Sequence, residues 1–140
     1  MIKNYFLVAF FITTGLYSQS NCKTGELYRS SDFGDGETQM AMPLVFEFVA
    51  DSIYIHNDLP NKKRGDFAKM LIVKKSCDWQ DDKTGNSVYL AKIVMDDKSL
   101  KEIPSRLEVQ MENGKGTIKL KHYQMPEIYF SAAVVEQEKN

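Results

Sequence analysis

The stretch RLEVQMENGKGTIKLK, residues 106–121, decides the fold class of this chain. Apolar and polar side chains alternate on both sides of Asn113-Gly114, a dipeptide that favours the type I′ turn of a two-residue β-hairpin. That turn places Val109 opposite Ile118 on one face, and the next pair along, an acid and a base, on the other face. A shift of one residue would put every side chain on the wrong face. The stretch therefore predicts one antiparallel hairpin in a single register.

Outward from this hairpin, the chain consists of short alternating runs separated by turn residues. The expected strands are 44–49, 53–56, 67–79, 88–95 and 127–135. Within 67–79 we expect one face to carry Phe67, Leu71, Val73, Cys77 and Trp79. Residues 29–39 are expected to form a long loop, and residues 97–103 one helical turn. Pro43, Pro104 and Pro126 are expected just ahead of strands, and Pro60 in a loop, where no ladder hydrogen bond is lost.

These runs predict an all-β fold, a single antiparallel meander of about seven or eight strands. The meander is expected to close into a barrel or to fold over as a sandwich. Its strand count and connectivity resemble those of small lipocalin-like barrels, without a lipocalin signature motif. No repeat, linker or low-complexity block divides the chain, so residues 21–140 are expected to form one β-domain.

Residues 1–20 have the layout of a secretory signal peptide. Lys3 precedes an uncharged apolar run, residues 5–12, and small residues stand at Ser18 and Ser20. The apolar run is too short for a spanning helix, which needs about 20 predominantly apolar residues. We therefore expect cleavage after Ser18 or Ser20 rather than a retained anchor. The mature protein is expected to be periplasmic or extracellular and to meet the membrane only during export.

Cys22 and Cys77 are the only cysteines. Outside the cytoplasm such a pair is expected to form a disulfide, worth roughly 4 kcal/mol for a loop of this size. Two alternatives remain at this stage, a lipid-modified Cys22 and two free thiols. Asn21 and Gln19 do not match the residues that lipid modification prefers before its cysteine.

Composition excludes several classes of function. The chain has 18 Lys and Arg against 19 Asp and Glu, which leaves no broad positive field for a nucleic acid. The basic cluster 62–64 is therefore expected to be a solvated loop, with contact with an anionic membrane surface as the alternative. His56 and His122, with two cysteines, are too few for a structural zinc site. Residues 32–37 and 78–82 are acidic and are expected to be flexible connections, with calcium binding as the alternative.

No catalytic set stands out from the sequence. A Gly-x-Ser-x-Gly elbow and phosphate-binding glycine motifs are absent, and no serine has a histidine that the sequence places beside it. We expect no catalytic residue, metal or cofactor. The strand aromatic residues, Trp79 and Tyr89 among them, are expected to pack in the core, with the lining of a ligand cavity as the alternative.

The expected function is that of an exported, non-catalytic β-domain, a binding or interaction module of the cell envelope. Its partner would be an unidentified protein or a small apolar ligand. Two alternatives remain: a lipocalin-like carrier of a small apolar molecule, and a small secreted hydrolase. The surfaces expected to serve an interaction module are the loop 29–39 and any free edge strand.

Overall fold

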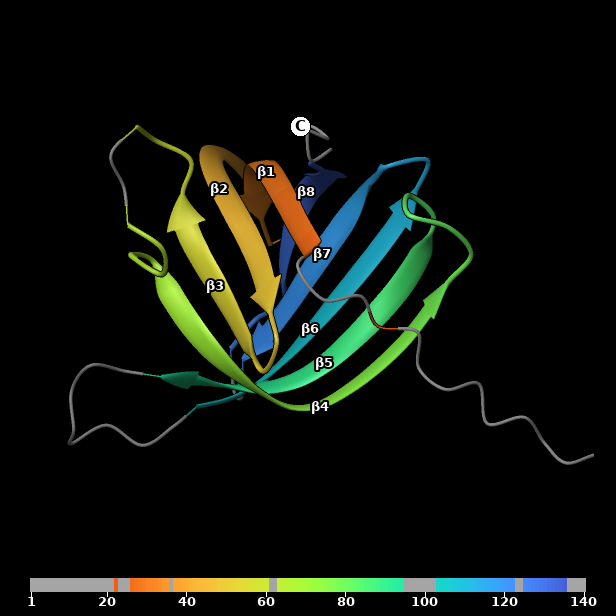
Figure 1. Cartoon of the computed structure of the whole chain (residues 1–140). Coiled ribbons are helices and arrows are strands. Elements are labelled where there is room, and N and C mark those ends of the chain that lie inside the picture. The colour runs from red at the N-terminus through yellow and green to blue at the C-terminus, as the bar shows by residue number, and fades with distance from the viewer. Residues whose placement is uncertain are drawn as a thin grey trace, which may run out of the picture.

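The chain folds into a closed antiparallel β-barrel in which each strand pairs with the next and the last pairs with the first. The computed structural model describes residues 22, 26–35, 37–60, 63–94, 103–122 and 125–135. Figure 1 shows the strands side by side in chain order around the barrel. The eight strands formed by the described residues are β1 (Glu26–Gly34), β2 (Gln39–Val49), β3 (Ser52–Asn57), β4 (Ala68–Trp79), β5 (Gly85–Val94), β6 (Ile103–Glu112), β7 (Lys115–His122) and β8 (Ile128–Val134). The barrel, rather than the sandwich, is therefore the form that the predicted meander takes.

The β6–β7 hairpin has the predicted register. Val109 lies opposite Ile118, and both side chains are fully buried. Asn113 and Gly114 have φ angles of 53° and 84°, the positive values that a type I′ turn requires. The expected hairpin before it, β2–β3, is also confirmed.

The predicted loop 29–39 is wrong, because most of it is strand. Residues 26–34 form β1, which closes the barrel by pairing with β8, and β2 begins at Gln39. A β-bulge between Ser30 and Asp32 shifts the register, so the residue that lies opposite a buried β8 side chain changes from Ser30, opposite Ala132, to Phe33, opposite Phe130. Ser30 is fully buried and donates a hydrogen bond from Oγ to the Asp32 carbonyl at 3.0 Å. Because a serine is buried here and the inward-facing positions change at the bulge, the sequence of β1 does not show the apolar–polar alternation that marks a strand.

A second bulge corrects the predicted face of β4. Ile72 pairs with Ala91 and Lys74 with Leu90, so Val73 is the extra residue. Ahead of the bulge the buried side chain is Met70, and after it the buried side chains are Cys77 and Trp79. Phe67, Leu71 and Val73 are exposed, contrary to the expectation that they share the face of Cys77 and Trp79. β4 also runs past β3, whose last pair with it is Ser52 with Leu71 (Figure 1).

Two prolines lie inside strands, where sequence reasoning placed them just ahead. Pro104 is the second residue of β6, and Pro43 lies within β2 at the step where its register with β1 shifts. Both sites are consistent with proline, which occurs at strand starts and bulges. The segments 1–20 and 97–102 and the tail after residue 135 lie outside the described residues. The last expected strand is confirmed as β8.

The two ends of the barrel differ. At the first, which we call the disulfide end, lie the β2–β3, β4–β5 and β6–β7 turns and the bond between Cys22 and Cys77. At the second, the apolar end, lie the β1–β2, β3–β4, β5–β6 and β7–β8 connections. Between them the inward side chains are tightly packed, and Leu44, Phe46 and Leu107 are fully buried. Any binding surface must therefore lie at an end or on the outside of this packed middle.

Candidate functional site

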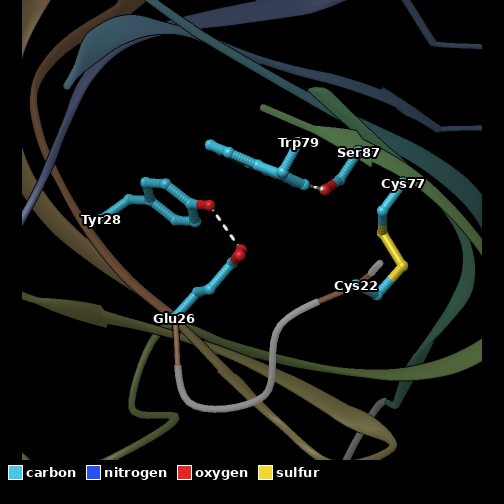
Figure 2. The surroundings of a disulfide bond; sticks show 6 residues. All are labelled: Cys22, Glu26, Tyr28, Cys77, Trp79 and Ser87. Atoms are coloured by element: carbon cyan, nitrogen blue, oxygen red, sulfur yellow. Dashed lines mark hydrogen bonds between the residues drawn. A yellow bond between two sulfur atoms is a disulfide. The ribbon is translucent and has the colours of Figure 1, made fainter. Parts of the chain in front are cut away.

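The disulfide end is closed by buried side chains. Cys22 and Cys77, with Cα atoms 5.0 Å apart, are joined as predicted, so the Cys22 sulfur that lipid modification would need is already bonded. Figure 2 shows this bond beside Trp79 and Ser87, with Tyr28 facing them. Tyr28, Cys77 and Trp79, which are drawn there, are all buried. A disulfide also fits an oxidising compartment.

The polar atoms at the disulfide end hydrogen-bond to one another. The Trp79 indole Nε1–H donates to Ser87 Oγ at 2.7 Å, and the Tyr28 hydroxyl donates to Glu26 Oε2 at 2.5 Å (Figure 2). Burial raises the pKa of Tyr28, and its hydrogen bond to Glu26 raises it further. Burial also raises the pKa of Tyr89 to about 12. Both phenols are therefore neutral at physiological pH. The buried polar groups at this end have hydrogen-bond partners, and the end is closed by packed side chains.

The apolar end has the opposite character. Its inward-facing side chains are only partly buried although they pack on the core. These side chains are Phe33, Met42, Ala68, Ile93 and Ile128. Ile103, the first residue of β6, is also partly buried. Phe33 stacks on the buried Phe130 with ring centroids 5.9 Å apart, and Phe130 in turn meets Phe46 at 5.0 Å. A continuous apolar surface thus leads from this end into the core.

Exposed apolar side chains surround the same end. Met40, Leu59, Phe67 and Met125 have exposed fractions of 60, 52, 50 and 51%. They lie at the start of β2, in the β3–β4 connection, just before β4 and in the β7–β8 connection. All four places belong to the apolar end. Grouped exposed hydrophobic side chains of this size mark interaction or ligand sites more often than scattered ones do.

A polar pair lies among these apolar side chains. Ser105 on β6 faces His122 on β7, and Oγ lies 2.7 Å from the imidazole Nδ1. Partial burial lowers the pKa of His122, so the ring is neutral at physiological pH. The Ser105 side chain is buried, and its Oγ also lies 3.4 Å from the Ile103 carbonyl oxygen, whereas the His122 imidazole is only partly buried.

Sequence reasoning missed the Ser105–His122 pair, although the signal was available. The register derived for the hairpin from Asn113-Gly114, continued to its far end, places Ser105 opposite His122. Most of the apolar side chains around the pair come from other strands and connections. No local sequence pattern predicts that they lie near Ser105 and His122.

Other hollows lie on the outer surface. One groove of about 790 Å³ runs over β1 and β8 and is lined by Arg29, Asp58 and Ala133 among others. Arg29 Nε and Asp58 Oδ2 form an ion pair of 2.5 Å at its side. This groove is open, and Lys115 also lines it.

The acidic stretches considered for calcium are not wholly connections, as the sequence predicted: Asp32 lies in β1 and Asp78 in β4, and the later part of each stretch forms a turn. Asp35 Oδ1 accepts hydrogen bonds from the backbone N–H groups of Glu37 and Thr38, which lower its pKa. Asp81 Oδ1 accepts two backbone hydrogen bonds within the β4–β5 turn. Within the described ranges, no three His, Cys, Asp or Glu side chains gather so that they could hold a metal ion.

The other residues that the sequence analysis singled out lie away from the Ser105–His122 pair. His56 on β3 lies 3.8 Å from Glu47, and Arg64 from the basic cluster donates from Nε to the same carboxylate at 2.9 Å. Arg64 also lies over the Tyr54 ring. Trp79 belongs to the disulfide end, at the far end of the twelve-residue strand β4.

Comparisons with known proteins add no family to this description. No family model matches the chain, and no curated protein or solved structure matches it. Among the residues that the structure describes, no helix has the length and apolar character needed to cross a membrane.

Proposed function

We propose that the protein is an exported, non-catalytic binding module that holds an apolar ligand at the apolar end of its barrel. The observation that carries the proposal is the group of four exposed apolar side chains, Met40, Leu59, Phe67 and Met125, around partly buried inward ones. Exposing such side chains to water is unfavourable, and a ligand that covers them regains the hydrophobic free energy.

The composition of this end favours a small molecule. Ligand sites in proteins are mostly apolar and carry a few polar groups that orient the ligand. Here Ser105 and His122 are such groups among apolar neighbours. We therefore favour an apolar molecule with one hydrogen-bonding group, held at the end of the barrel above the packed middle. This is the carrier alternative, with its site displaced from a deep cavity to one end.

Export is supported by two independent features. Residues 1–20 have the layout of a signal peptide, and the Cys22–Cys77 bond is of a kind that persists in oxidising compartments. The module would therefore act in the periplasm or outside the cell.

Titration with a fluorescent fatty-acid analogue tests the binding proposal. We expect saturable binding at micromolar concentration, weakened about tenfold by the double variant Met40→Ser/Met125→Ser through the lost apolar contacts. The matched control is Val73→Ser, which removes an equally exposed apolar side chain from the outer face of β4. We expect little quenching of Trp79, the only tryptophan, because it lies at the other end. No saturable binding, or equal weakening by the control, would contradict the proposal.

For the hydrolase alternative, Ser105 and His122 are the candidate catalytic residues. A serine hydroxyl within hydrogen-bond reach of an imidazole is the first element of nucleophilic catalysis. A catalytic histidine is oriented by a third group, commonly a carboxylate. In the described part of the chain no carboxylate contacts the His122 ring. Hydrolysis of an activated ester that is lost in Ser105→Ala would establish this alternative, and we expect no such activity.

A further inference from the structure

The outer face of β4–β7 carries an uneven charge. In four adjacent cross-strand rows, outward residues include six cations, Lys69, Lys74, Lys92, Arg106, Lys119 and Lys121, which we call the basic face. One row alone places Lys74, Leu90, Arg106 and Lys121 side by side. Among the described residues of these rows the one acid is Glu108, whose Oε1 lies 2.6 Å from Arg106 Nη2. The whole chain has a net charge of −1, so this face is positive at the expense of the others.

Apolar side chains protrude from the β4 and β5 side of the basic face. Val73 is 64% exposed because the bulge in β4 adds it as an extra residue, and Leu71 and Leu90 beside it are also exposed. Phe67, exposed just before β4, continues this line to the apolar end. The surface is therefore a convex strip of apolar groups, with cations beside it on β4 and β5 and Ser52 of β3 opposite Leu71.

We propose that the basic face docks on the surface of an anionic phospholipid bilayer. Cations attract the phosphate headgroups, each contributing about a fivefold gain in partitioning. Val73, Leu71 and Leu90 then enter the interface between headgroups and acyl chains, as the apolar side of an interfacial element does. This departs from the expectation that the protein meets the membrane only during export.

The combination of charges and apolar groups selects the bilayer over other anionic partners. A soluble polyanion would engage the cations and leave Val73 and Leu90 in water. A protein partner would have to offer a concave acidic surface to a convex strip, whereas a bilayer deforms around it. Docking would also bring Phe67, and with it the edge of the apolar end, to the bilayer. An apolar ligand could then pass between membrane and protein, a consequence that rests on the proposed function.

Vesicle flotation tests the docking proposal with the oxidised protein. The vesicles contain phosphatidylcholine alone or mixed with phosphatidylglycerol. We expect binding to the mixed vesicles that weakens with salt, and little binding to phosphatidylcholine alone. The triple variant Lys74→Gln/Arg106→Gln/Lys121→Gln should bind roughly 100-fold more weakly, and Val73→Ser/Leu90→Ser roughly tenfold more weakly.

A charge-matched control isolates the face from the net charge. The variant Lys63→Gln/Lys83→Gln/Lys115→Gln removes three cations outside the basic face and should bind as the parent protein does. All proteins share the same N-terminus, so the leader cannot cause a difference between them, and thermal melting verifies that each is folded.

Three outcomes would overturn the docking proposal: equal loss in the charge-matched control, equal binding to both kinds of vesicle, or no effect of Val73→Ser/Leu90→Ser. The last would assign the face to a soluble polyanion or an acidic protein. The fatty-acid titration uses no vesicles, so failure of docking and failure of ligand binding are seen separately.

Discussion

Removal of the Cys22–Cys77 bond should destabilise the barrel by about 4 kcal/mol. The bond joins residues 55 positions apart, and the loop that it closes contains β1, β2, β3 and most of β4. In the chain-entropy description a 15-residue loop is worth roughly 3 kcal/mol and a 100-residue loop roughly 4.7 kcal/mol. A loop of intermediate length therefore gives about 4 kcal/mol, lost when the unfolded chain is no longer constrained.

Urea unfolding of the double variant Cys22→Ala/Cys77→Ala, followed by circular dichroism, measures this loss. We expect the free energy of unfolding to fall by about 4 kcal/mol and the melting temperature by roughly 15 °C. The slope against urea should rise, since the unfolded chain without the bond exposes more surface. The parent protein in reductant provides a second measurement that involves no substitution.

The position of the disulfide allows its effect on stability to be measured separately from any effect on ligand binding. It lies at the opposite end from Met40 and Met125, so the fatty-acid affinity of folded Cys22→Ala/Cys77→Ala should match that of the parent. A loss of unfolding free energy below about 1 kcal/mol would refute the entropic argument. A large loss of affinity in the folded variant would refute the separation of the two ends.

Three further predictions concern single groups. Ser87→Ala should cost roughly 1–3 kcal/mol in urea unfolding, because it removes the acceptor of the buried Trp79 indole N–H, and an unchanged midpoint would contradict this. Tyr89 has a pKa of about 12 when folded and 10.0 when unfolded, so the unfolded chain loses its proton first as pH rises above 10. The contribution of Tyr89 to stability should fall by about 2 kcal/mol by pH 12, and Tyr89→Phe should flatten this part of the urea–pH profile. The pKa of His122 is lowered from 6.5 when folded, so stability should fall as pH drops below 6.5, and a His122→Gln profile that is equally steep would disprove the assignment.

The contributions that are local in sequence were predictable. Asn113-Gly114 specified the β6–β7 turn, and the alternation around it specified the register, which the structure confirms. The same register contains the Ser105–His122 pair. The Cys22–Cys77 bond was predictable as well, because only two cysteines exist to pair.

Tertiary structure decided the features that depend on closing the barrel. Eight strands close only if some of them bend sharply, and bulges at Ser31 and Val73 supply the bend. Each bulge reverses the inward and outward faces of its strand, which is why β1 was read as a loop and Val73 as a core residue.

The amino-acid sequence alone specifies the strand class, the register of one hairpin and the disulfide. Only the tertiary structure decided which end is plugged, that Met40, Leu59, Phe67 and Met125 gather at the other, and that six cations share one face. The physical reason is the range of the forces. Turn geometry and side-chain alternation act between near neighbours, whereas burial at each end is set by strands distant in the chain that meet only when the cylinder closes.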